Sequence, residues 1–124
     1  MCIRDSVKTL HPRVHGGILA DQNNPEHLAA IDELDIKPFD LVIINLYPFA
    51  GTIASGANFE ESIEQIDIGG PSMLRGAAKT HSSVSVICQT SQYGQLLDAI
   101  KAGGFTEAEP VSYTHLTLPT KRIV

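Results

Sequence analysis

The run LVIINL, residues 41–46, constrains the fold of this chain more than any other stretch. It is apolar over most of its length, rich in β-type residues, and bounded by Asp40 and by Tyr47-Pro48. Such a run is typical of a strand buried on both faces, which occurs in parallel sheets covered by helices. The run SVSVIC, residues 83–88, predicts a second strand.

Four further segments carry apolar residues at helical spacing. Each begins with residues that favour a helix amino end: Asn24-Pro25, Asn58, the turn Gly69-Gly70-Pro71, and Ser91. The first two predicted helices carry the apolar residues Leu28, Ile31 and Leu34, and Phe59, Ile63 and Ile66. The third predicted helix follows the turn at Gly69-Gly70-Pro71 and runs to about Lys79. The fourth carries Tyr93, Leu96, Leu97 and Ile100. Strands that alternate with helices predict an α/β fold, a parallel sheet flanked by helices with right-handed crossovers and ligands at the carboxyl ends of its strands.

Charge and composition exclude several functions. The formal net charge is −5, without a basic stripe, so we expect no nucleic-acid partner. No apolar run approaches the roughly 20 residues of a spanning helix, so we expect no membrane partner. Two cysteines, Cys2 and Cys88, show no pairing pattern, and Met1 is not followed by a convincing signal peptide. We therefore expect a cytoplasmic protein.

Polar residues gather in four segments, VKTLHP, NLYPF, QIDIGG and RGAAKTH. Loops at the strand ends of an open parallel sheet meet at one edge, so Asn45, Tyr47 and Asp67 are expected to converge beside helical N–H groups after Gly70. Lysines 8 and 79 would supply positive charge or a proton. Taken singly, these residues also fit a solvated lysine, a packing tyrosine and a turn carboxylate. Together they favour a phosphorylated, nitrogen-rich small molecule, and the histidines lack the spacing of a metal site.

Four blocks follow one another along the chain: VKTLHPRVHGGIL, FDLVIINLYPF, IEQIDIGGPSMLRGAAKTH and VSVIC. They closely resemble the amino-terminal domain of bifunctional purine biosynthesis proteins, which carry AICAR transformylase and IMP cyclohydrolase activities. The resemblance covers roughly residues 7–105. It implies a three-layer fold like that of methylglyoxal synthase, incomplete at its amino end. It also implies the ring closure of 5-formamidoimidazole-4-carboxamide ribotide to inosine monophosphate, with loss of water.

The same resemblance implies roles for individual residues. Lys79 matches a proton-transferring lysine, Asp67 an aspartate that contacts the base and carboxamide, and Tyr47 and Lys8 residues that line the reacting group. The implied substrate contacts are Val7, Lys8, Thr9, Ile44, Asn45, Asp67, Ile68, Gly69, Gly70 and Arg75. The implied partner is the purine ribotide, without metal or organic cofactor, and parent proteins of the family are homodimers. 10-Formyltetrahydrofolate would serve only a transformylase domain, which we expect to be absent from this chain.

The two ends differ from the middle of the chain and look like translated sequencing-adaptor sequence. We expect residues 1–6 and 111–124 to be non-native tails and residues 7–110 to be a partial cyclohydrolase domain. Ser6 stands where the family has an arginine, so one nucleotide contact is expected to be missing. The alternative is a non-catalytic regulatory module of the same fold, like the effector-binding domain of carbamoyl phosphate synthetase; methylglyoxal synthase itself ranks third.

Overall fold

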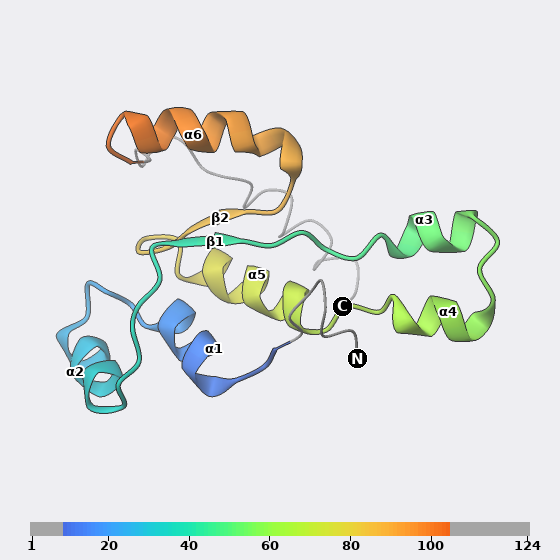
Figure 1. Cartoon of the computed structure of the whole chain (residues 1–124). Coiled ribbons are helices and arrows are strands. Elements are labelled where there is room, and N and C mark those ends of the chain that lie inside the picture. Colours follow the sequence, from blue (N-terminus) through green and yellow to red (C-terminus); the bar gives the residue numbers. More distant parts are fainter. Residues whose placement is uncertain (1–8, 105–124) are drawn as a thin grey trace.

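A small parallel sheet lies between layers of helices in the computed structural model, which describes residues 9–104 (Figure 1). The elements, in chain order, are α1 (Pro12–Leu19), α2 (Pro25–Glu33), β1 (Leu41–Ile43), α3 (Phe49–Ala54), α4 (Phe59–Glu64), α5 (Gly69–Lys79), β2 (Ser85–Ile87), the 3-10 helix η1 (Thr90–Gln92) and α6 (Tyr93–Lys101). Val7, Lys8 and the two predicted tails lie outside the described residues. The predicted α/β order is confirmed, with α1 and α3 as additional helices.

The two strands pair in parallel, as the sequence predicts. Val42 lies opposite Val86 in the register, and the Ile44 N–H extends the ladder by donating to the Ile87 carbonyl at 2.9 Å. Both strands are shorter than predicted. The ladder ends after β2 because the Gln92 side-chain oxygen accepts the N–H groups of Cys88, at 3.2 Å, and Gln89, at 3.1 Å.

The sheet has helices on both faces, but they cover it unequally. Val42 and Val86 pack with α1 and α5 in a core completed by Ile18, Met73, Leu74, Ala77 and Val84. On the opposite face, Ile87 packs against Leu96 of α6, with Leu41 and Tyr93 beside them. Ile43 is nevertheless 46% exposed. The prediction that the first strand is buried on both faces is therefore wrong at Ile43, which lies beyond the apolar cover that α6 supplies.

Helix α1 was not predicted, because the pair Gly16-Gly17 is typical of a break. The His11 side chain caps α1 by accepting the Arg13 N–H at 3.2 Å, and Pro12 occupies the first helical position. A Cβ on Gly17 would clash with the Lys37 carbonyl oxygen and approach the Phe39 ring to 2.9 Å. Glycine therefore allows the segment that leads into β1 to cross directly over α1.

Residues 49–66, which we call the arm, comprise α3, a turn and α4. The two helices pack on each other and project beyond the carboxyl ends of the strands (Figure 1). Asn58 and Glu61 form a capping box at the start of α4, which confirms the predicted cap at Asn58. The predicted apolar face of this helix is open: Phe59 is 79% exposed, Ile63 47% and Ile66 50%.

Helix α6 begins differently from the prediction. Ser91 lies inside η1 and does not cap α6, whose cap position is occupied by Gln92. Of the predicted apolar stripe, Leu96 is buried, whereas Leu97 and Ile100 are exposed. Among residues 9–104, no helix has the length and apolar character needed to cross a membrane.

Candidate functional site

The Asp67 carboxylate joins two loops at the carboxyl edge of the sheet. One oxygen, Oδ1, accepts the Gly70 N–H at 2.9 Å, and Oδ2 accepts the Tyr47 N–H at 3.4 Å. Gly70 lies in the first turn of α5, where unpaired N–H groups and the helix dipole stabilise negative charge. The predicted convergence of Tyr47 and Asp67 is thus present, and it closes the base of the arm.

A third segment reaches the same corner through Gly69. A Cβ on Gly69 would lie 2.8 Å from the Thr9 carbonyl oxygen and 3.0 Å from the Thr9 nitrogen. The backbone of Thr9 therefore lies directly against the start of α5, which only glycine permits. Thr9 and the residues around Asp67, namely Tyr47, Gly69 and Gly70, form what we call the Asp67 corner.

Asn45 lies close to the end of β1 and contacts a residue that the sequence analysis did not select. Its side-chain amide and the Tyr93 hydroxyl lie at hydrogen-bond distance, 3.1 Å from Nδ2 and 3.4 Å from Oδ1. Tyr93 is the first residue of α6 and was predicted only as part of an apolar stripe. Its position after the second strand, where ligand loops gather, is the signal that could have identified it.

The remaining predicted site residues are placed in different ways. Ile44 packs its side chain against the core, and its N–H donates to the Ile87 carbonyl at 2.9 Å. Ile68, next to Gly69, is exposed. Val7 and Lys8 lie outside the described residues. Ile68 is therefore the residue of this group whose side chain is accessible beside the Asp67 corner.

The two cations of α5 are separated from the Asp67 corner. Helix α5 runs back from the carboxyl edge, and its last turn lies near the amino ends of the strands (Figure 1). Lys79 belongs to this last turn. At 1.5 Å per residue, Lys79 is about 15 Å from Gly69 along the helix axis, and Arg75 about 9 Å. The structure of one chain therefore does not bring Lys79 to Asp67, although the sequence analysis groups them.

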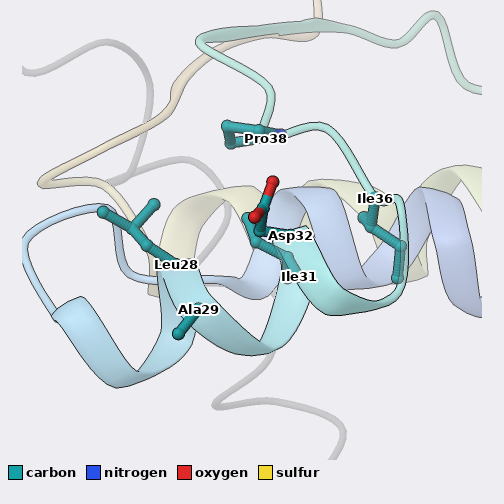
Figure 2. Close-up of a pocket in the computed structure, with 6 residues that line it drawn as sticks. All are labelled: Leu28, Ala29, Ile31, Asp32, Ile36 and Pro38. Carbon is teal, nitrogen blue, oxygen red and sulfur yellow. The ribbon is translucent and has the colours of Figure 1, made fainter.

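The described residues offer no site for a metal ion, since no group of three or more potential His, Cys, Asp or Glu ligands occurs among them. A pocket of about 400 Å³ lies on α2, away from the Asp67 corner (Figure 2). Its lining is Leu28, Ala29, Ile31, Asp32, Ile36 and Pro38. One carboxylate in an apolar lining does not provide the donors that a phosphorylated ligand needs.

The chemistry available at the Asp67 corner is that of orientation and hydrogen bonding. A fixed carboxylate accepts N–H groups, the start of α5 donates them, and a backbone amide, an asparagine and two tyrosines lie nearby. Such a set can hold a polar heterocycle and stabilise charge that develops on an oxygen. It contains no nucleophilic cysteine or serine placed beside a base.

Comparison with known proteins agrees with the fold. The family model for the MGS-like domain matches residues 3–72. The crystal structure of ForH aligns with a TM-score of 0.66 and 35% identity, over 94% of this chain and 60% of ForH. The parallel sheet with flanking helices is therefore that of an MGS-like domain.

Curated relatives extend the match beyond the family model. The bifunctional purine biosynthesis protein PurH of Corynebacterium glutamicum (strain R) is 56% identical over 108 residues, which are 87% of this chain and 21% of that protein. PurH of Mycobacterium ulcerans is 59% identical over 103 residues, 83% of this chain and 20% of that protein. The chain thus spans about a fifth of the length of these relatives. It belongs to the family of MGS-like domains and corresponds to a fragment of PurH.

Proposed function

We propose that this chain supplies part of an IMP cyclohydrolase site within a longer bifunctional purine biosynthesis protein. The fixed carboxylate of Asp67 between Gly70 and Tyr47, in a chain 56% identical to PurH, supports this most directly. The substrate is 5-formamidoimidazole-4-carboxamide ribotide, and the product is inosine monophosphate. Ile44, Asn45, Ile68 and the residues of the Asp67 corner contact the ribotide.

The proposed reaction joins two groups of one molecule. The carboxamide nitrogen attacks the formyl carbon, a carbon–nitrogen bond forms, and the formyl oxygen leaves as water with two protons from the nitrogens. Asp67 accepts an N–H from the carboxamide and holds it against the formyl group, which lowers the entropic cost of closure. Backbone N–H groups at the start of α5 stabilise the oxyanion as it forms.

Proton transfer in this proposal falls to lysine and tyrosine side chains. Lys79 gives or takes the proton, and Tyr47 and Lys8 line the reacting group, as the family resemblance implies. Lys79 lies about 15 Å from Gly69 along the axis of α5. The position of Lys79 on α5 therefore does not by itself bring its side chain to a substrate at the Asp67 corner.

The proposal includes no metal and no organic cofactor, because a dehydrating ring closure neither transfers electrons nor imports a group. 10-Formyltetrahydrofolate would serve only the formyl transfer of a longer parent protein. We place the reaction in the cytoplasm, with a homodimeric parent protein and the purine ribotide as its small-molecule partner.

The test uses a chimera in which this chain replaces the matching fifth of the C. glutamicum protein. Formation of inosine monophosphate from the ribotide is measured chromatographically, with binding of the product measured by calorimetry. Asp67→Asn should lower turnover at least tenfold, because a lost hydrogen bond to a charged group costs about 1.5–3 kcal/mol. Asp98→Asn, an exposed carboxylate on α6, is the matched control.

Three outcomes distinguish a cyclohydrolase from a non-catalytic regulatory module. Turnover that depends on Asp67 supports the cyclohydrolase. Binding without turnover in the chimera would contradict it and favour the regulatory module. A chimera that neither binds nor converts the ribotide would exclude both.

A further inference from the structure

Tyr93 contacts both the core and the carboxyl edge of the sheet. Its side chain is partly buried and packs beside Ile87 and Leu96. Its hydroxyl lies at hydrogen-bond distance from the side chain of Asn45. Tyrosine suits such a position, because its ring is apolar and its hydroxyl finds a polar partner. Packing against the core therefore holds the Tyr93 hydroxyl at a defined point beside Asn45.

The turn between β2 and α6 determines where this ring lies. Within the turn, the Gln92 side-chain oxygen accepts the N–H groups of Cys88 and Gln89. Tyr93 follows directly as the first residue of α6. The strands are parallel, so this turn lies at the same edge of the sheet as the segment that follows β1 (Figure 1). The start of α6 is therefore fixed next to the segment that carries Asn45.

Asn45 obtains a defined orientation from this contact. Its side chain is exposed, and its hydrogen bonds within residues 9–104 join it to the Tyr93 hydroxyl. The last torsion of an asparagine side chain is broad, so an exposed carboxamide without a partner can exchange the positions of its donor and its acceptor. The Tyr93 hydroxyl lies 3.1 Å from Nδ2 and 3.4 Å from Oδ1. A hydroxyl held against the amide in this way limits its rotation.

The oriented carboxamide lies within reach of a ligand at the Asp67 corner. Asn45 precedes Tyr47 by two residues, which span at most about 7 Å of chain. The Tyr47 N–H in turn donates to the Asp67 carboxylate. One N–H of the Asn45 amide and a lone pair of its Oδ1 are left over by the contact with Tyr93. The carboxamide can therefore donate one hydrogen bond to a polar ligand and accept another.

We propose that Tyr93 is a positioning residue, whose hydroxyl orients the Asn45 carboxamide for binding of the ribotide. This inference rests on the proposed function, in which Asn45 contacts the ribotide. Tyr93 acts through Asn45 and does not touch the ligand. Asn45 takes no part in proton transfer, so it binds the substrate and the transition state alike. Loss of the Tyr93 hydroxyl therefore weakens binding and leaves the closure of the bound ribotide unchanged.

The orientation of Asn45 is tested in the full 124-residue chain without ligand. Nitrogen-15 relaxation measures the order parameter of the Asn45 side-chain amide. The reference is Asn23, whose exposed side chain forms no hydrogen bond with another described residue. Asn45 should be more ordered than Asn23, and Tyr93→Phe should lower its order parameter to that of Asn23. Ser91→Ala, which removes an exposed hydroxyl 3.5 Å from the Gln89 side chain, is the matched control and should change nothing.

A double-mutant cycle in the chimera tests the action through Asn45. Tyr93→Phe keeps the ring and should raise the KM for the ribotide and the dissociation constant of inosine monophosphate about fivefold, as expected for one lost hydrogen bond. The kcat should stay within about twofold of the wild type. Asn45→Ala should raise KM at least as much. Tyr93→Phe added to Asn45→Ala should have no further effect, because Tyr93 then has no side chain to orient.

Several results would overturn the positioning role. One is an Asn45 amide that is as mobile as Asn23 in the wild type, or equally ordered in Tyr93→Phe. Another is a Tyr93→Phe variant with lowered kcat and unchanged KM, or one whose loss adds fully to that of Asn45→Ala. An active chimera in which Tyr93→Phe leaves KM unchanged refutes the positioning role alone. An inactive wild-type chimera refutes the cyclohydrolase, and the order parameter of Asn45 still decides whether Tyr93 orients it.

Discussion

Replacing Gly69 by alanine should destabilise the chain and loosen the Asp67 corner. The added Cβ would lie 2.8 Å from the Thr9 carbonyl oxygen and 3.0 Å from the Thr9 nitrogen. Both atoms belong to the backbone, so the strain can be relieved only by moving a chain segment or α5 itself. Overpacking of this kind costs about 1–3 kcal/mol.

Gly76→Ala, on the same helix, is the matched control. Its Cβ would meet Leu19 Cδ2 at 3.3 Å, the end of a flexible and partly exposed side chain that can move aside. Alanine is favoured over glycine within a helix by about 0.5–1 kcal/mol. Gly76→Ala should therefore be neutral or stabilising, whereas Gly69→Ala should lose about 1–2 kcal/mol after any helix gain.

Urea unfolding followed by circular dichroism measures both variants, and product binding to the chimera measures the effect on the corner. Gly69→Ala should lower the unfolding midpoint and weaken binding of inosine monophosphate, whereas Gly76→Ala should do neither. Equal midpoints for the two variants would refute the close approach of Thr9 to α5. A destabilised Gly69→Ala with unchanged binding would separate the corner from the ligand.

Other substitutions test single features of the structure. Asn58→Ala removes the capping box of α4 and should cost about 1 kcal/mol in urea unfolding; an unchanged midpoint would mean that the arm does not contribute to cooperative stability. Gln22→Ala removes the 3.1 Å hydrogen bond to the Phe39 carbonyl and should cost about 1 kcal/mol in the same assay, whereas a gain would contradict this contact. In the chimera, Lys79→Ala should lower turnover of the ribotide at least a hundredfold, because a positioned general acid or base contributes about 10²–10⁴-fold; unchanged turnover would exclude Lys79 from the proton transfer.

The sequence was sufficient for the layers of the fold because they depend on local patterns. The β-rich runs and the capped helices at Asn24 and Asn58 correspond to elements of the structure. Helix α1 was missed because Gly17 serves the close crossing of Lys37, a contact between segments distant in sequence. Helix α3 was missed because it has only six residues and no side-chain cap.

Part of the candidate site was also predictable from the order of strands and loops along the chain. The convergence of Tyr47 and Asp67 follows from the rule that strand-end loops of parallel sheets share an edge. Tyr93 escaped prediction because its hydrogen bond with Asn45 depends on where α6 begins. The distance of Lys79 from this edge follows from the direction of α5 relative to the strands, which a helical pattern does not contain.

The hydrogen bond from Tyr47 to Asp67 makes the arm a natural place for variation in length. The arm begins just after Tyr47 and ends just before Asp67, and the Tyr47 N–H donates to the Asp67 carboxylate at 3.4 Å. A segment whose ends already meet can be shortened, lengthened or exchanged at small loop-closure cost, since the position of α5 does not depend on it. Substitution of residues 49–66 by a short flexible linker should therefore leave the pairing of β1 with β2 intact, and sequence-divergent insertions can be accommodated there.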